Sequence, residues 1–142
     1  MSTVINISTY LLFNGQATQA LEFYHEVLGG DLDIMRHGDM GNTEHPDWVM
    51  HGQLSTPFGW DLMAGDHPNE EAPAKVGNTQ ACIWGDDSVR MTEIFNALAV
   101  GGTVQTALAQ QMWGDSYGDL TDQFGIFWAV NISGNRTAPL AD

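Results

Sequence analysis

Positive charge is scarce in this sequence. Its 142 residues include only four Lys and Arg against 18 Asp and Glu, which gives a formal net charge of −14 with His neutral. A surface of this sign repels phosphate backbones and anionic lipid surfaces, so nucleic-acid and membrane partners are not expected. The same charge favours solubility, and it attracts a cationic or polar aromatic ligand by long-range steering.

Cysteine and long apolar runs are also lacking. Cys82 is the single cysteine, so the chain can form no intrachain disulfide and no thiolate cluster for zinc or iron–sulfur. We expect Cys82 to be a small buried hydrophobe, because it lies in an apolar run. No run is long enough to span a bilayer, and Met1–Asn6 lacks the basic region and apolar core of a signal peptide. These absences favour a cytoplasmic location.

An approximate internal repeat is the main positive signal. The segment Glu22–Gly30 recurs in looser form as Ile94–Gly102, at an offset of 72 residues. Each copy follows a short apolar stretch and has the pattern of a helix that stops at a glycine pair. The repeat predicts two equivalent half-chains packed as one body, with a ligand site where they meet.

Hydrophobic spacing predicts the same order of elements in both halves. The first helix starts near Ala17 and the second follows possible N-cap residues at Asp86–Ser88. Loops are expected over His37–Asp47 and Asp66–Gly77, where Gly, Pro and polar residues gather. The predicted strands are Val4–Phe13, Leu32–Arg36, Trp48–Leu54, Trp60–Ala64, Thr79–Trp84 and Phe127–Ile132. The segments Thr103–Leu108 and Gly114–Asp122 are predicted to be strands or turns. The pattern βαβββ therefore occurs twice, an α+β arrangement with modules at residues 1–68 and 69–142 of one structural domain.

Several of these segments are similar to a known family. They are Tyr10–Gly15, Ala20–Tyr24, Gly29-Gly30, Met50–Leu54, Leu62–Asp66 and, most specifically, Trp113–Trp128. The chain resembles the vicinal-oxygen-chelate superfamily, which includes glyoxalase I, bleomycin-resistance proteins and extradiol dioxygenases, and within it the PhnB-like group. The resemblance implies two βαβββ modules that each curve a sheet into half a cup and together form a cavity. It also implies a homodimer, often with strands or modules shared between chains.

Metal-dependent members of this superfamily carry His or Glu ligands at four strand positions. The resemblance places these positions near Thr9, on the strand of His51 and Gln53, between Asn78 and Cys82, and at Phe127–Ala129. At most one or two ligands remain there, so we expect no complete metal site and no bound cofactor. His25, His37, His45 and His67 are expected not to complete one. Asp115, Asp119 and Asp122 lack cation-loop spacing and are interpreted as a solvated turn.

The aromatic residues suggest a different kind of site. Five tryptophans lie in or beside predicted strands, and they either pack the core and a dimer interface or line an apolar cavity. In the second case His51 and Gln53 supply the polar groups, and the walls are Trp113, Tyr117 and Trp128. His51 is either a hydrogen-bonded strand histidine or a pocket group that acts as general base or donor, oriented by Asp61 or Asp66.

Two functional hypotheses remain open at this point. The first is a non-catalytic protein that binds a small molecule between its modules, as bleomycin-resistance proteins do. The second is a divergent enzyme of lyase, isomerase or dioxygenase type, with His51 as catalytic residue or as part of an altered divalent-metal site. Nucleophile elbows and phosphate-binding glycine loops are absent from the sequence, and fold analogy alone does not choose between the two.

Overall fold

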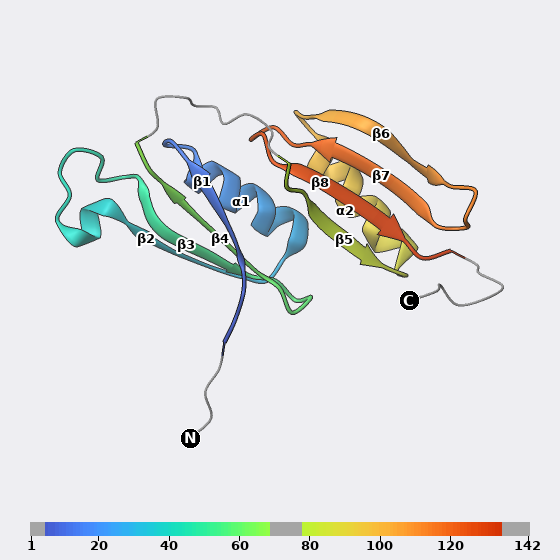
Figure 1. Cartoon of the computed structure of the whole chain (residues 1–142). Helices are drawn as coiled ribbons and strands as arrows, with labels where there is room; N and C mark the ends of the chain where they lie inside the picture. Colours follow the sequence, from blue (N-terminus) through green and yellow to red (C-terminus); the bar gives the residue numbers. More distant parts are fainter. Residues whose placement is uncertain (1–4, 69–77, 135–142) are drawn as a thin grey trace, which may run out of the picture. The chain divides into compact units, whose positions relative to one another are not determined.

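The computed structural model describes residues 5–68 and 78–134. The chain divides into two compact units, Met1–Ala74 and Lys75–Asp142. Each unit has its own four-stranded mixed sheet and its own α-helix, in the order βαβββ (Figure 1). The predicted α+β fold of two βαβββ modules is thereby confirmed.

The first unit contains one sheet in the order β1-β4-β3-β2. Strand β1 runs parallel to β4, and the other two pairings are antiparallel. Its elements are β1 (Thr9–Phe13), α1 (Ala17–Leu28), β2 (Asp31–Arg36), the 3-10 helix η1 (His37–Met40), β3 (Val49–Ser55) and β4 (Asp61–Asp66).

The second unit repeats this topology, with the sheet order β5-β8-β7-β6 and a parallel pair formed by β5 and β8. The internal sequence repeat therefore corresponds to a structural repeat. The elements are β5 (Ala81–Gly85), α2 (Ser88–Ala99), β6 (Thr103–Gln110), β7 (Ser116–Thr121) and β8 (Phe127–Ile132).

Each helix covers one face of its own sheet (Figure 1). A period of 3.6 residues places the apolar residues of each helix on one side, and this side is buried. The buried residues include Ala20, Leu21, Tyr24 and Leu28 of α1 and Met91, Ile94, Phe95 and Leu98 of α2. Neither helix is long and apolar enough to cross a membrane, within the residues that the structure describes. We call the sheet face opposite the helix the far face of each unit.

Strand alternation decides which side chains reach the far face. In the first sheet these include Tyr10, Leu12, Asp33, His51, Gln53, Asp61 and Met63. In the second sheet they are Cys82, Trp84, Tyr117, Asp119, Phe127 and Ala129.

Two predicted segments differ from the structure. The first strand begins at Thr9 instead of near Val4, because β4 offers pairing positions only to Thr9–Phe13. The segment His37–Asp47, predicted as a loop, contains η1 and several internal hydrogen bonds. The predicted connection Asp66–Gly77 lies mostly outside the described residues, and Asp66 itself belongs to β4.

Candidate functional site

The far face of the first sheet brings together polar side chains from β1, β3 and β4. The ring of Tyr10 lies beside that of His51, with a centroid separation of 5.6 Å. Gln53 follows two residues later on β3 and donates from Nε2 to Oδ2 of Asp61 at 3.0 Å. Burial raises the pKa of the Tyr10 hydroxyl, so this group stays protonated and able to donate at neutral pH. The predicted pair His51 and Gln53 therefore does share one surface.

Gly65 makes room for this arrangement. A Cβ at this position would lie 2.7 Å from the Tyr10 hydroxyl and 3.4 Å from Nε2 of His67. The main-chain oxygen of Met50 would be 3.1 Å away, and the same oxygen accepts a long 3.4 Å hydrogen bond from Tyr10. The side chains of Tyr10 and His67 thus both occupy space beside Gly65 that a larger residue would need.

The two carboxylates considered as partners for His51 serve other groups. Asp61 accepts from Gln53. Asp66 lies on the helix side of the sheet, 1% exposed, and accepts backbone N–H groups of Gly15, Ala17 and Val49. Asp66 therefore joins the start of α1 to the start of β3, which is a structural role.

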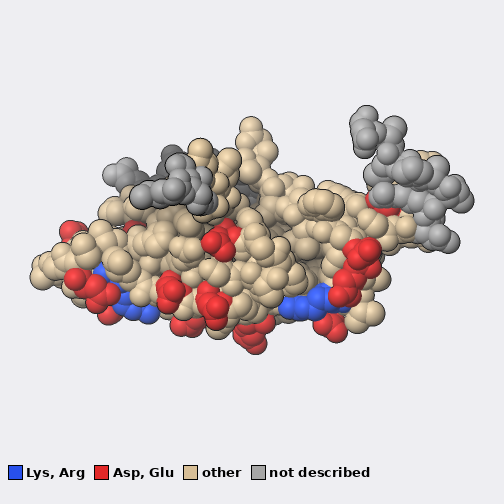
Figure 2. All heavy atoms as spheres, turned by 90° about the horizontal axis from the view of Figure 1, so that it is seen from below, with Lys and Arg blue, Asp and Glu red and all other residues tan. Residues whose placement is uncertain are grey.

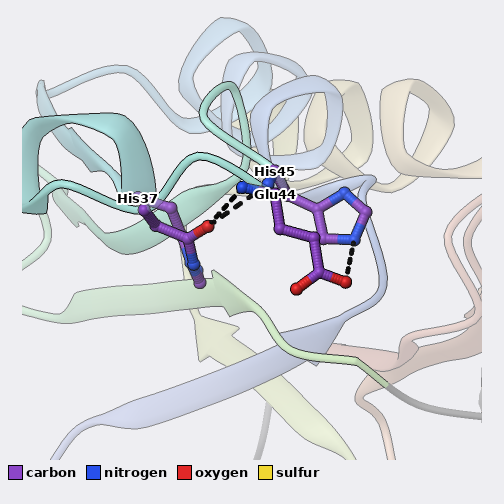
Figure 3. Close-up of polar contacts among 4 residues, drawn as sticks. His37, Glu44 and His45 are labelled. Carbon is purple, nitrogen blue, oxygen red and sulfur yellow. Dashed lines mark hydrogen bonds and ion pairs between the residues drawn. The ribbon is translucent and has the colours of Figure 1, made fainter.

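Two loop histidines have structural contacts and are not simply solvated. The ring of His45 stacks on that of Trp48, with the ring centroids 3.8 Å apart. Nε2 of His45 lies 3.9 Å from Oε1 of Glu44 (Figure 3). His37 lies between Asn42, at 3.1 Å from its Nδ1, and the main-chain oxygen of Asp66, at 3.2 Å from its Nε2. These contacts fasten the segment after β2 to the end of β4.

The far face of the second sheet carries a bonded pair on β7. The hydroxyl of Tyr117 donates to Oδ2 of Asp119 at 2.9 Å. Cys82, Ala129 and Asp119 lie side by side across β5, β8 and β7. Cys82 is exposed, so its prediction as a buried hydrophobe is wrong. The apolar run around it is a strand whose alternate residues face away from α2.

The remaining predicted site residues lie elsewhere in the second unit. Trp113 is 55% exposed and lies in the turn between β6 and β7. Trp128 is fully buried on the α2 side of the sheet, and its Nε1 donates to Oδ2 of Asp122 at 2.8 Å. We therefore assign Trp128 to the core, since it cannot line the far face from that position.

The interpretation of three aspartates as a solvated turn is also wrong. Asp115 and Asp122 are each 3% exposed. Asp122 accepts the backbone N–H groups of Phe124 and Ile126, at 2.8 and 3.0 Å. Asp115 accepts from the Asn131 amide and from the Gly134 backbone, both at 3.0 Å. Around these two carboxylates, donors fixed by the fold take the place of water. Asp119, in contrast, points to the far face.

The residues present do not match a superfamily metal centre. Thr9 lies on the helix side of β1 together with Leu11 and Phe13, so Tyr10 is the residue that reaches the far face. Within residues 5–68 and 78–134, no three His, Cys, Asp or Glu side chains are grouped so that they could hold a metal ion. Three or more such donors are the usual requirement for a catalytic divalent ion.

Comparison with known proteins places the fold in a defined class. A glyoxalase/bleomycin-resistance/dioxygenase domain from Frankia is 15% identical, covers 94% of this chain and 100% of its own length, and gives a TM-score of 0.61. The PhnB protein from Bacillus cereus is 20% identical, with coverages of 91% and 100% and a TM-score of 0.77. No protein-family model matches the chain. The fold is therefore that of the glyoxalase/bleomycin-resistance/dioxygenase proteins.

Nearer relatives define the family. Protein PA1353 from Pseudomonas aeruginosa is 32% identical, covers 93% of this chain and 100% of its own, and gives a TM-score of 0.78. Protein YjdN from Escherichia coli is 25% identical and covers 89% of this chain and 94% of its own length. The chain belongs to the PhnB-like family that includes these proteins.

Sequence reasoning missed the roles of two residues, Tyr10 and Asp119. Tyr10 belongs to an apolar run, Tyr10–Phe13, in which no polar residue marks the two faces. Its signal was Gly65, a strand glycine of the kind that marks a close approach. Asp119 was grouped with neighbouring aspartates, although its spacing of two from Tyr117 on a strand predicts a shared face.

Proposed function

We propose that this protein binds a small organic molecule against the far faces of its sheets, through direct side-chain contacts. The supporting observation is the composition of these faces. Large apolar side chains stay exposed there, with Leu12 at 62% and Trp84 at 78%. A few hydrogen-bonding groups lie among them, as in small-molecule sites, which are mostly apolar with few polar groups.

The polar part of the first far face combines Tyr10, His51 and Gln53 with the carboxylates of Asp33 and Asp61. Tyr10 donates, the Gln53 amide is fixed by Asp61, and His51 can donate or accept. Such groups suit carbonyl, hydroxyl or amide functions on an aromatic ligand. Binding by this face needs no metal coordination, which agrees with the donor set described above.

Cys82 offers a direct readout of this proposal, because it is exposed on the second far face. Compounds that raise the melting temperature in a thermal-shift screen should slow alkylation of Cys82 by N-ethylmaleimide. At a concentration ten times the Kd, we expect the rate to fall about tenfold, in proportion to the free protein. Mass spectrometry of timed samples measures the rate.

The control is the Cys82→Ser variant, which should show the same thermal shift and no labelling. Protection must also vanish when the compound is diluted away. If every stabilising compound leaves the alkylation rate unchanged, binding to this far face is excluded. If no aromatic or cationic compound stabilises the protein, the proposed function itself fails.

The pH dependence of this labelling provides a second prediction. Partial burial raises the pKa of the Cys82 thiol above its ordinary value, so less thiolate is present at a given pH than in a free peptide. We expect the alkylation rate of the folded protein to level off at a higher pH than that of the urea-unfolded chain. Coinciding pH profiles for the two states would contradict this assignment.

A further inference from the structure

The hydrogen bond between Tyr117 and Asp119 leaves one carboxylate oxygen of Asp119 without a partner. Tyr117 donates its hydroxyl proton to Oδ2 of Asp119 at 2.9 Å. The other carboxylate oxygen, Oδ1, is buried and has no hydrogen-bond partner; no other side-chain nitrogen or oxygen in the described parts of the chain is in this state. A buried acceptor without a donor costs about 1–3 kcal/mol, and more for a charged group. Such an atom calls for an explanation.

Neighbouring side chains of the second sheet do not supply the missing donor. Burial and the hydrogen bond to Asp119 raise the pKa of Tyr117, while a hydrogen bond from Gln80 lowers it. The phenol therefore stays protonated at neutral pH, and its single proton is already committed to Oδ2. Of the two residues paired with Asp119, Ala129 on β8 has no polar side chain, and Thr106 on β6 makes no hydrogen bond to Oδ1. A donor for Oδ1 has to come from outside this set.

We propose that Oδ1 of Asp119 accepts an N–H group from the ammonium or guanidinium end of an organic cation that lies on the far face of the second sheet. This inference rests on the proposed function and specifies its ligand class. Asp119 as a whole is only partly buried. Its terminal torsion is broad, so a small rotation presents Oδ1 to the ligand. Ala129 is buried beside Asp119, whereas Phe127, on the same face of β8, is partly exposed and can contact the rest of the ligand.

The charge of the chain supports a cationic ligand. The formal net charge is −14, and Figure 2 shows acidic side chains spread over the face in view with far fewer basic ones. Long-range attraction raises the local concentration of cations, while the buried oxygen fixes where the cationic group binds. The two effects differ in their salt dependence, because exposed charges are screened by salt and buried pairs much less.

A matched pair of probes tests the inference. Tryptamine and indole-3-propionate share the indole ring and differ in the charge of the side chain. Isothermal titration of the whole protein in 0.5 M NaCl should give tryptamine a Kd at least about tenfold lower than that of indole-3-propionate. Asp119→Asn should remove this preference. Asp119→Ser is the second variant, since it removes the carboxylate and keeps an acceptor for the Tyr117 hydroxyl.

Asp86→Asn is the charge-matched control, because Asp86 is exposed in the turn between β5 and α2 and its loss changes the net charge equally. This variant should keep the full preference for tryptamine. Equal binding of the two probes to the unmutated chain would overturn the cation site and leave the binding function standing. A preference that survives in both Asp119 variants would also overturn it. If neither probe bound, both proposals would fail.

Discussion

Replacing Asp66 by Asn should lower the free energy of unfolding by about 3 kcal/mol, although the two side chains have the same size. Both carboxylate oxygens are in use. Oδ1 accepts from the backbone of Gly15 at 2.8 Å and of Ala17 at 3.0 Å, and Oδ2 accepts from Val49 at 2.9 Å. An amide keeps one oxygen and turns the other acceptor into a donor that faces an N–H group. At least one buried backbone donor then loses its partner.

Urea unfolding followed by tryptophan fluorescence measures this loss. Asp47→Asn is the matched control, because Asp47 is an exposed carboxylate of the same unit and a surface substitution changes stability by no more than about 0.5 kcal/mol. A loss below about 1 kcal/mol in Asp66→Asn would show that the three N–H groups find water instead. In that case Asp66 would not be the link between α1 and β3.

The Asp66 prediction also bears on the candidate site. Val49 begins the strand that carries His51 and Gln53 to the far face. Loss of the bond to Val49 frees the start of this strand, so binding that depends on His51 should weaken together with stability. His51→Ala removes the side chain without this loosening. Comparing the two variants by ligand titration separates the chemical contribution of His51 from the positioning of its strand.

The helices and their buried faces could be predicted from the sequence, because a helix repeats every 3.6 residues and its apolar residues then mark one side. Met91, Ile94, Phe95 and Leu98 illustrate this, and all four are buried. The glycine pairs were equally clear. Gly29 and Gly101 have positive φ angles of 77° and 76°, which glycine adopts readily because it has no Cβ.

The faces of the strands were harder to predict wherever an apolar run was continuous. The strand Ala81–Gly85 and the segment Phe127–Val130 contain apolar residues on both faces, so the sequence does not show which residues face the helix. Cys82 was therefore predicted to be buried, and Trp128 was assigned to a cavity wall. Pairing settles the matter, because Ala81 is opposite Trp128 and both face α2, whereas Cys82 and Ala129 face away.

The burial of individual aspartates could not be predicted from composition or spacing. Asp115, Asp119 and Asp122 lie within eight residues of each other, and the sequence gives them the same character. The structure gives each a different set of donors: Asn131 and a backbone amide for Asp115, Tyr117 for Asp119, and Trp128 with two backbone amides for Asp122. These donors come from other positions in the fold, so only the assembled sheet distinguishes a structural carboxylate from one available to a ligand.

Replacing the second glycine of either pair by Ala should be among the most damaging single substitutions in the chain. A Cβ on Gly30 would lie 2.0 Å from the main-chain oxygen of Ser55, and a Cβ on Gly102 would lie 2.3 Å from that of Thr121. Both contacts are with backbone, so no side-chain rotation relieves them. Gly30 also has a φ of 94°, whereas Gly102 is not among the described glycines with positive φ.

This difference allows steric overlap and backbone strain to be separated by experiment. Gly59→Ala is the control for backbone strain alone, because Gly59 has a φ of 80° and nothing lies within 4 Å of the position that a Cβ would take. We expect this variant to lose about 1 kcal/mol of unfolding free energy. Gly102→Ala introduces steric overlap alone and should lower the free energy of unfolding by about 3 kcal/mol. Gly30→Ala introduces both overlap and backbone strain and should lower it most. Urea unfolding of the three variants gives the order. If Gly59→Ala proved as costly as Gly102→Ala, close packing of the helix end against the sheet would not be the reason for the glycine pair, and the structural meaning of the repeat would have to be sought in turn geometry alone.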